Sequence, residues 1–115
     1  MKYMLLIYSN ESEWQDLPKA EIDERVAAYR AYTEALTQAG VVVALDRLQP
    51  ASSATTVRVA AGKTNVLNGP YAETREQLGG FYMIDVPHLD AALSWAARCP
   101  GAGFGGIEVR PVWAM

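Results

Sequence analysis

Two stretches of this sequence are apolar at nearly every position and have the length of a β-strand: residues 2–8 and residues 80–86, where Asp85 is the exception. Successive side chains of a strand point to opposite faces of its sheet, so both stretches carry apolar side chains on both faces. In the first stretch these are Tyr3, Leu5 and Ile7 on one face and Met4, Leu6 and Tyr8 on the other. The pattern predicts two central strands, each covered on both faces.

A long helix is predicted between the first strand and Gly40. It begins at Pro18, a residue that suits the first turn of a helix, and Gly40 supplies the C-terminal stop. Acidic residues near its start, Glu21, Asp23 and Glu24, complement the positive end of the helix dipole. Its buried stripe is predicted from three- and four-residue steps to comprise Ile22, Val26, Tyr29, Thr33 and Leu36.

A second, shorter helix is predicted over residues 89–97, between His88 and Pro100. We expect His88 to occupy the N-cap, as a helix-start residue rather than a general base. Cys99 follows an apolar run and has no histidine near it in sequence. We therefore expect a small buried residue at the helix end rather than a nucleophile.

Further strands and a hairpin complete the pattern. Val41 begins a β-branched strand that ends near Leu48, and residues 107–113 form the last strand. Between them, alternating residues 56–60, a turn at Gly62-Lys63 and a return arm over 64–67 predict an inserted β-hairpin. The order β-α-β, hairpin, β-α-β predicts an α+β fold: one ferredoxin-like βαββαβ domain over residues 1–115, with the hairpin inserted between its halves.

The helices of such a fold cover one face of the sheet only. The other face would then expose leucine, methionine, tyrosine and phenylalanine side chains over more area than a monomer usually shows. A second copy of the chain is the simplest cover. The sequence therefore predicts a homodimer with its sheets packed face to face, burying roughly 1,600 Å² or more in total.

Composition excludes several classes of partner. The formal net charge is −3 and no basic stripe is present, so nucleic acid is not expected to bind, and Arg25, Tyr29 and Arg30 are interpreted as a solvated helix face. The apolar start of the chain is much shorter than the ~20 residues of a membrane span, which favours a cytoplasmic protein without a membrane partner. One cysteine and one histidine provide no metal cluster, and the glycine-rich residues 101–106 lack the order of a nucleotide-binding loop. We expect no metal and no cofactor.

The segment from Asn68 to Glu76, called the signature segment below, concentrates turn-forming and polar residues. Asn68-Gly69-Pro70 is strong turn chemistry. Four polar residues follow directly before a central strand: Glu73, Thr74, Arg75 and Glu76. Their side chains either line a pocket or solvate a bend, and the residues themselves leave both interpretations open.

The run NGPYAETREQLGGFY, which starts at Asn68, resembles the DGPFAETKEQLGGYY signature of the DGPF (YCII-related) domain proteins. The resemblance extends to the opening residues 1–7, to Leu48-Gln49-Pro50 with residues 55–58, and to residues 108–112. It implies a dimeric α+β barrel, in the structural superfamily of muconolactone isomerase and the YciI proteins, and no settled activity. For some members it implies a regulatory context linked to sigma factors.

Two positions depart from the family pattern. Asn68 replaces the aspartate, so the first residue of the signature cannot act as a carboxylate, and Tyr71 replaces phenylalanine and adds a hydroxyl. We interpret aspartate and asparagine as turn formers at this position, since either side chain can bond the backbone two residues on. The histidine–aspartate pair implied by YciI-like relatives does not carry over, because His88 is the sole histidine and starts a helix.

Two functional hypotheses follow. In the first, the chain is a small-molecule-binding or protein-interaction domain, and the signature segment organises the hairpin and the dimer edge through an ion pair of Arg75 with Glu73, Glu76 or Glu108. In the second, it is a cofactor-free, isomerase- or lyase-like enzyme of small-molecule metabolism. The candidate residues of its site are Glu73 or Glu76 as catalytic general acid or base, Arg75 or Arg110 as anion anchor, and Tyr71 and Asn68 as ligand-binding groups.

Overall fold

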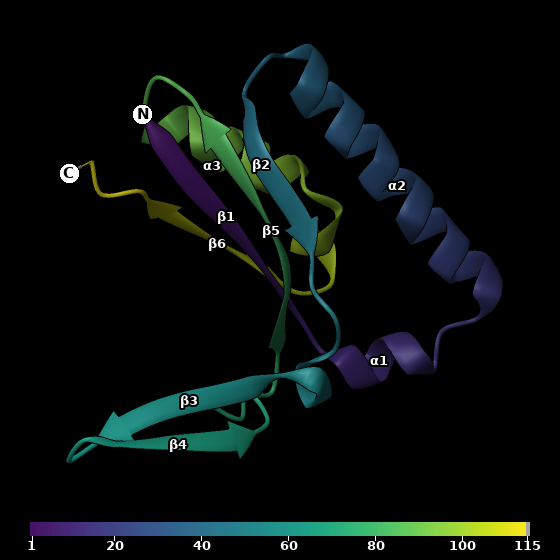
Figure 1. Cartoon of the computed structure of the whole chain (residues 1–115). Coiled ribbons are helices and arrows are strands. Elements are labelled where there is room, and N and C mark those ends of the chain that lie inside the picture. The colour runs from purple at the N-terminus through teal and green to yellow at the C-terminus, as the bar shows by residue number, and fades with distance from the viewer. Residues whose placement is uncertain (115) are drawn as a thin grey trace.

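The computed structural model describes residues 1–114, and Figure 1 shows its elements. In chain order they are β1 (Lys2–Ser9), α1 (Glu11–Gln15), α2 (Lys19–Gln38), β2 (Val42–Arg47), η1 (Ala51–Ser53), β3 (Thr55–Ala60), β4 (Lys63–Asn68), β5 (Gln77–Asp85), α3 (Leu89–Arg98), η2 (Pro100–Gly103) and β6 (Gly106–Pro111). Most predicted elements are confirmed to within a few residues. The five-residue helix α1 was not predicted.

Four strands form an antiparallel sheet in the order β2-β5-β1-β6, while β3 and β4 pair in a separate two-stranded sheet. The two strands with apolar residues on both faces, β1 and β5, are therefore the central ones, as predicted. Tyr3 lies opposite Ile84 and Leu5 opposite Tyr82. This order and these directions are those of the ferredoxin-like fold, and the hairpin is its insertion.

The hydrophobic core lies between one face of the sheet and the helices α2 and α3. Sheet residues and helix residues share one buried cluster, in which Leu5, Leu36 and Ile84 are fully buried. Tyr32 of α2 packs edge-on against Tyr82, with ring centroids 5.3 Å apart, and its hydroxyl donates a hydrogen bond to the Trp95 carbonyl at 2.7 Å. This side chain ties together α2, the sheet and α3.

The predicted stripe of α2 is wrong at one position and incomplete at another. Val26 is 40% exposed, whereas Tyr32, which was not counted, is buried. The predicted solvated face is also wrong at two positions. The side chain of Tyr29 packs against the buried cluster, and the guanidinium carbon of Arg25 lies 3.8 Å from the Phe104 ring centroid and 4.9 Å from that of Trp14. Trp14 belongs to α1, so stacking on the arginine couples this short helix to α2 and to the loop before β6.

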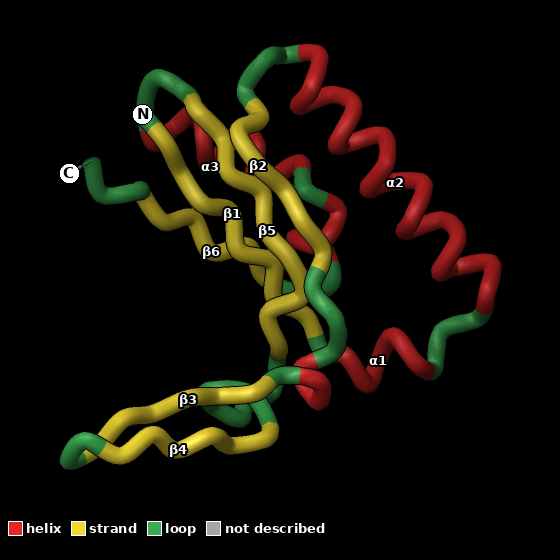
Figure 2. Tube along the Cα trace, viewed as in Figure 1, coloured by secondary structure: helices red, strands yellow, loops and turns green. Residues whose placement is uncertain are grey.

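The hairpin β3–β4 turns at Ala61 and Gly62, both at positive φ (51° and 77°), rather than at the predicted Gly62-Lys63. Positive φ at both loop positions matches the twist of the two strands that they join. The hairpin projects from one end of the main sheet, away from α2 and α3 (Figures 1 and 2). No residue of β3 or β4 is buried.

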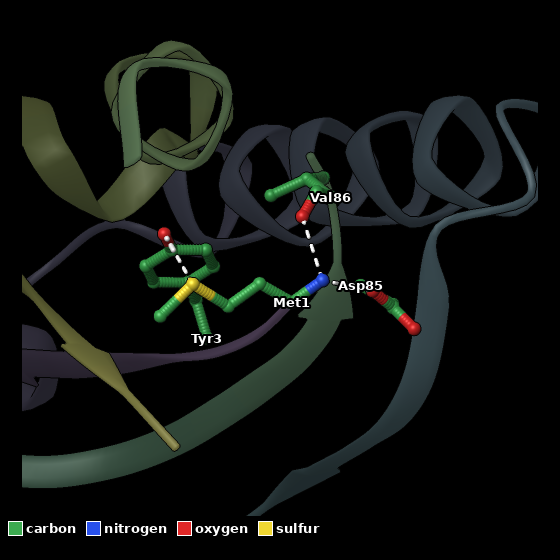
Figure 3. Close-up of polar contacts among 4 residues, drawn as sticks. All are labelled: Met1, Tyr3, Asp85 and Val86. Atoms are coloured by element: carbon green, nitrogen blue, oxygen red, sulfur yellow. Dashed lines mark hydrogen bonds and ion pairs between the residues drawn. The ribbon is translucent and has the colours of Figure 1, made fainter. Parts of the chain in front are cut away.

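The opposite end of the main sheet holds the start of the chain (Figure 3). The Met1 ammonium donates hydrogen bonds to the Asp85 carboxylate at 2.8 Å and to the Val86 carbonyl at 3.0 Å. The hydrogen bond from the ammonium and its charge hold the pKa of the Asp85 carboxyl below its usual range. Beside it, the Tyr3 hydroxyl donates to the Met1 sulfur at 3.3 Å. These contacts attach the start of β1 to the end of β5.

The chain is less compact than a self-contained domain of its size. Its radius of gyration is 16.1 Å, where a compact 115-residue domain has about 13 Å. Its accessible surface is 7979 Å², where a compact monomer of this mass has about 6,200 Å². The hairpin, which has no buried residue, and α2, in which only Tyr32 and Leu36 are buried, are among the exposed parts of the chain.

Gly105 is predicted to be irreplaceable in the turn before β6. A Cβ atom at this position would lie 2.0 Å from the Tyr8 carbonyl oxygen, whereas one at Gly103 would meet nothing within 4 Å. Gly105→Ala should therefore lower the free energy of unfolding by about 3 kcal/mol, and Gly103→Ala should change it far less. Urea unfolding of both variants checks this. Equal stability of the two would contradict the close approach.

Candidate functional site

The signature segment connects β4 to β5, and its residues from Tyr71 to Glu76 are exposed in the single chain. Asn68 is the last residue of β4 and lies opposite Thr55. The turn is made by the next residue, Gly69, which has φ 113° and donates its backbone N–H to the Ala54 carbonyl at 2.7 Å. No side-chain hydrogen bond of Asn68 occurs in the described structure, so the predicted turn-forming bond from its side chain is wrong.

The next part of the segment folds back onto the hairpin. The guanidinium carbon of Arg58, in β3, lies 4.8 Å from the centroid of the Tyr71 ring. The Thr56 hydroxyl, also in β3, donates to the Gly69 carbonyl at 2.9 Å. Tyr71 therefore packs over one face of the hairpin, although 76% of its surface is exposed.

The end of the segment is held by Gln77, the first residue of β5. Its side-chain amide donates to the Thr74 carbonyl at 2.7 Å, and its amide oxygen accepts from the Glu11 backbone N–H at 3.0 Å. The Glu11 carboxylate in turn accepts from the Ala51 backbone N–H at 2.9 Å. Through these bonds α1, η1 and the signature segment form one network. Gln77 was not among the predicted site residues. A polar residue directly before an apolar strand is the sequence feature that could have identified it.

The two groups of predicted site residues lie at different ends of the sheet. Gln77, which directly follows the signature segment, lies opposite Ser9, while Arg110 lies opposite Met4. Five residues of strand separate these positions along β1, or about 17 Å. Within one chain, the sheet does not bring Arg110 beside Glu73, Arg75 or Glu76.

The predicted ion pair of Arg75 does not form. Among the residues that the structure describes, no salt bridge joins it to Glu73, Glu76 or Glu108. Glu108 pairs with Arg110 instead, at 2.5 Å, and the hydrogen bond raises the pKa of the Arg110 guanidinium above its usual value. The Tyr8 hydroxyl donates to the same carboxylate at 3.4 Å.

Tyr8, Glu108 and Arg110 share the sheet face that no helix of the chain covers, called the open face below. The strand registers place four apolar side chains on the same face: Met4, Leu6, Phe81 and Met83. Tyr8 and Glu108 were not predicted as site residues. The alternation of charged Glu108 and Arg110 with apolar Ile107 and Val109 was the signal that could have found them, because it places both charges on one face.

An open groove of about 560 Å³ runs beside α2 and contains none of the predicted site residues. It is lined by Val26, Tyr29, Arg30, Thr33, Glu34, Thr37 and Gln38. Two of its hydroxyl groups form hydrogen bonds within the protein. The Tyr29 hydroxyl accepts from the Cys99 thiol at 4.0 Å, and the Thr33 and Tyr82 hydroxyls are bonded to each other at 2.7 Å. Burial, followed by the nearby Cys99 thiol, raises the pKa of Tyr29.

The structural predictions for His88 and Cys99 are confirmed. His88 is the N-cap of α3, and its Nδ1 accepts from the Ala91 backbone N–H at 3.2 Å. Cys99 is 2% exposed, and burial raises the pKa of its thiol.

Over residues 1–114, no group of three or more histidine, cysteine, aspartate or glutamate side chains could hold a metal ion. No helix in this part of the chain is long and apolar enough to cross a membrane.

The fold and its open face define a ferredoxin-like α+β domain with an inserted hairpin. The chain belongs to the YCII-related domain family, whose sequence model matches residues 1–115. It is 44% identical over 119 aligned positions to an uncharacterised protein of Rhizobium meliloti (strain 1021), covering 97% of this chain and 92% of that protein.

Among solved structures, the fold is similar to that of 5-chloro-2-hydroxyhydroquinone dehydrochlorinase (TftG) from Burkholderia phenoliruptrix AC1100, in complex with 2,5-dihydroxybenzoquinone. The TM-score is 0.56 and the sequence identity 17%, over 98% of this chain and 94% of that chain. At this identity the likeness shows the fold alone.

Gln77→Ala is predicted to release the signature segment. The variant loses the hydrogen bonds to Thr74 and Glu11, so the free energy of unfolding should fall by about 1–2 kcal/mol. Hydrogen exchange should become faster at residues 11–13 and 69–76. Gln49→Ala, at an exposed position without a described side-chain hydrogen bond, is the control and should leave both regions unchanged. Unaltered exchange in Gln77→Ala would show that the network does not hold the segment.

Proposed function

We propose that this protein functions as a homodimer, joined through the open face of its sheet, that binds a small organic molecule beside the paired sheets. The observation that carries the proposal is an apolar sheet face that has three polar side chains, Tyr8, Glu108 and Arg110, along one side. Met4, Leu6, Phe81 and Met83 form its centre, and no helix of the described chain packs on them. Central strands with an uncovered apolar face favour association with a second sheet.

The surface of the single chain supports association. It exceeds that of a compact monomer of this mass by about 1,800 Å². A standard stable interface buries about 800 Å² on each partner, so the surplus is large enough for one. Because the open face is the same on both copies, a two-fold axis can pair it with itself.

The polar side chains of the open face support a ligand as well as a partner. Arg110 is 67% exposed at its side chain and pairs with Glu108, while Tyr8 adds a hydroxyl. A guanidinium, a carboxylate and a phenol beside apolar side chains suit a flat molecule that carries hydroxyl or anionic oxygen groups. A two-fold axis running across the strands would also bring the signature segment of one protomer toward Arg110 of its partner.

Under this proposal the signature segment supplies the second wall of the site. Tyr71, Arg75 and Asn68 are its proposed ligand-binding groups. Glu73 and Glu76 complete it as the acidic members, and all of these side chains except that of Asn68 lie in the loop before β5. Their exposure in the single chain leaves them free to contact a partner or a ligand.

An enzyme is the alternative, and the likeness to TftG favours it, since that protein is a dehydrochlorinase bound to a dihydroxybenzoquinone. In this alternative Glu73 or Glu76 acts as general base and Arg75 or Arg110 anchors an anionic substrate. A carboxylate needs burial to work as a base near neutral pH, and both glutamates are exposed in the single chain. The binding function therefore has the stronger support.

Native mass spectrometry tests the proposal. We predict that the purified protein has twice the mass of one chain and carries an additional small molecule. Leu6→Glu places a charge in the centre of the open face, so it should weaken the dimer at least 100-fold and release the molecule. Leu93→Glu is the matched control, because Leu93 is 45% exposed on α3, away from the open face.

Two results would count against this function. A wild-type protein that stays monomeric at its highest soluble concentration would exclude the dimer. A dimer that carries no additional mass and shows no affinity for 2,5-dihydroxybenzoquinone, used as a probe in calorimetry, would remove the support for a ligand of this class. Circular dichroism of both variants establishes that they fold.

A further inference from the structure

We propose that the β3–β4 hairpin is an arm whose valine face packs against a second copy of this chain. The valine face comprises Val57, Val59 and Val66 together with three uncharged polar residues, Thr55, Thr64 and Asn68. The inference rests on the proposed homodimer and adds to it a second contact surface, separate from the open face of the main sheet.

The register of the hairpin separates its two faces. Thr55 lies opposite Asn68, Val57 opposite Val66 and Val59 opposite Thr64, so these six side chains share one face. The three valines are 59%, 66% and 62% exposed, in the order Val57, Val59, Val66. The face carries no charged residue. A surface of this kind suits an apolar protein partner rather than an ion or a nucleic acid.

The other face of the hairpin is already in use. Arg58 stacks on Tyr71 of the signature segment at 4.8 Å, and the Thr56 hydroxyl holds the Gly69 carbonyl. The signature segment thus braces the hairpin from one side and leaves the valines uncovered. Tyr71, which replaces the family phenylalanine, keeps the ring that this packing needs.

The hairpin needs a partner for its own stability. A two-stranded ribbon that stands alone is marginally stable in water. Each strand has six residues, a length of about 20 Å, and none of them is buried. The hairpin projects away from α2 and α3, so the core of its own chain does not cover it (Figures 1 and 2). What covers the valine face must come from outside the chain.

A second copy is the occupant that the surface area supports. The surplus of about 1,800 Å² over a compact monomer exceeds the roughly 800 Å² that one partner contributes to a standard interface. In a two-fold dimer each hairpin contacts the partner and is contacted by the partner's hairpin or sheet, so both arms are covered at once.

The test uses the full chain and a variant that keeps the hairpin paired. Val57→Glu combined with Val66→Lys replaces one cross-strand apolar pair by an opposite-charge pair, which preserves the hairpin and makes its face polar. We expect the dimer dissociation constant, measured by sedimentation, to rise roughly 100-fold, since two valines are lost from each protomer. Asn65→Glu, on the braced face opposite Arg58, is the control and should leave the constant within about threefold.

A second measurement reports the contact directly. In dimers mixed from isotope-labelled and unlabelled chains, isotope-filtered nuclear Overhauser effects should join the methyl groups of Val57, Val59 and Val66 to the partner. A dimer with an unchanged dissociation constant in the double variant and without such effects would overturn the arm while leaving the dimer in place. A monomeric wild type would overturn both proposals.

Discussion

The two central strands are the constraint on which the rest of this structure depends. β1 and β5 carry apolar side chains on both faces, and the chain has two main helices, which cover one face. Leu5 and Ile84 are buried beneath those helices, whereas Leu6 and Met83 point the other way and remain partly exposed. The same strands therefore build the core of the monomer and a surface that favours a partner. Hydrophobic burial, not a particular polar contact, sets both outcomes.

The signature segment gains a physical role from its contacts. Gln77 binds the Thr74 carbonyl and the start of α1, and Tyr71 lies over Arg58 on the hairpin. These contacts explain why such a segment sits between a projecting hairpin and a central strand: it fixes the hairpin relative to the sheet. The acidic residues Glu73 and Glu76 have no part in this bracing in the single chain. They remain the candidates for contact with a ligand or a partner.

The sequence predicted the ferredoxin-like order and the central strands because those depend on local patterns. Alternation within β1 and β5 and the stop signals around the helices are visible in any single segment. The capping role of His88 and the burial of Cys99 followed from position in the same way. The prediction failed where the outcome depended on contacts between distant segments. Arg25 has the spacing of a solvated residue, but two aromatic rings from other elements enclose it.

The candidate site was harder to predict than the fold. The ion pair predicted between Arg75 and Glu73, Glu76 or Glu108 does not form among the described residues, and Glu108 pairs with Arg110, two residues further along β6. Asn68 was predicted to form the turn through its side chain, and the backbone of Gly69 forms it. Tyr8 was counted as an apolar residue and Gln77 was not considered. The hydrogen bonds that these two side chains make, to Glu108 and to Glu11, involve residues distant in the sequence. A single sequence shows where polar residues occur in a strand. Which side chains they contact depends on how the strands pair.

Small-angle X-ray scattering of the wild-type protein in solution can establish whether a second copy of the chain covers the open face. We predict a scattering mass twice that of a single chain at micromolar concentration, and a scattering curve that two face-to-face sheets reproduce. A scattering mass of one chain, with the 16.1 Å radius of gyration of the isolated molecule, would contradict it.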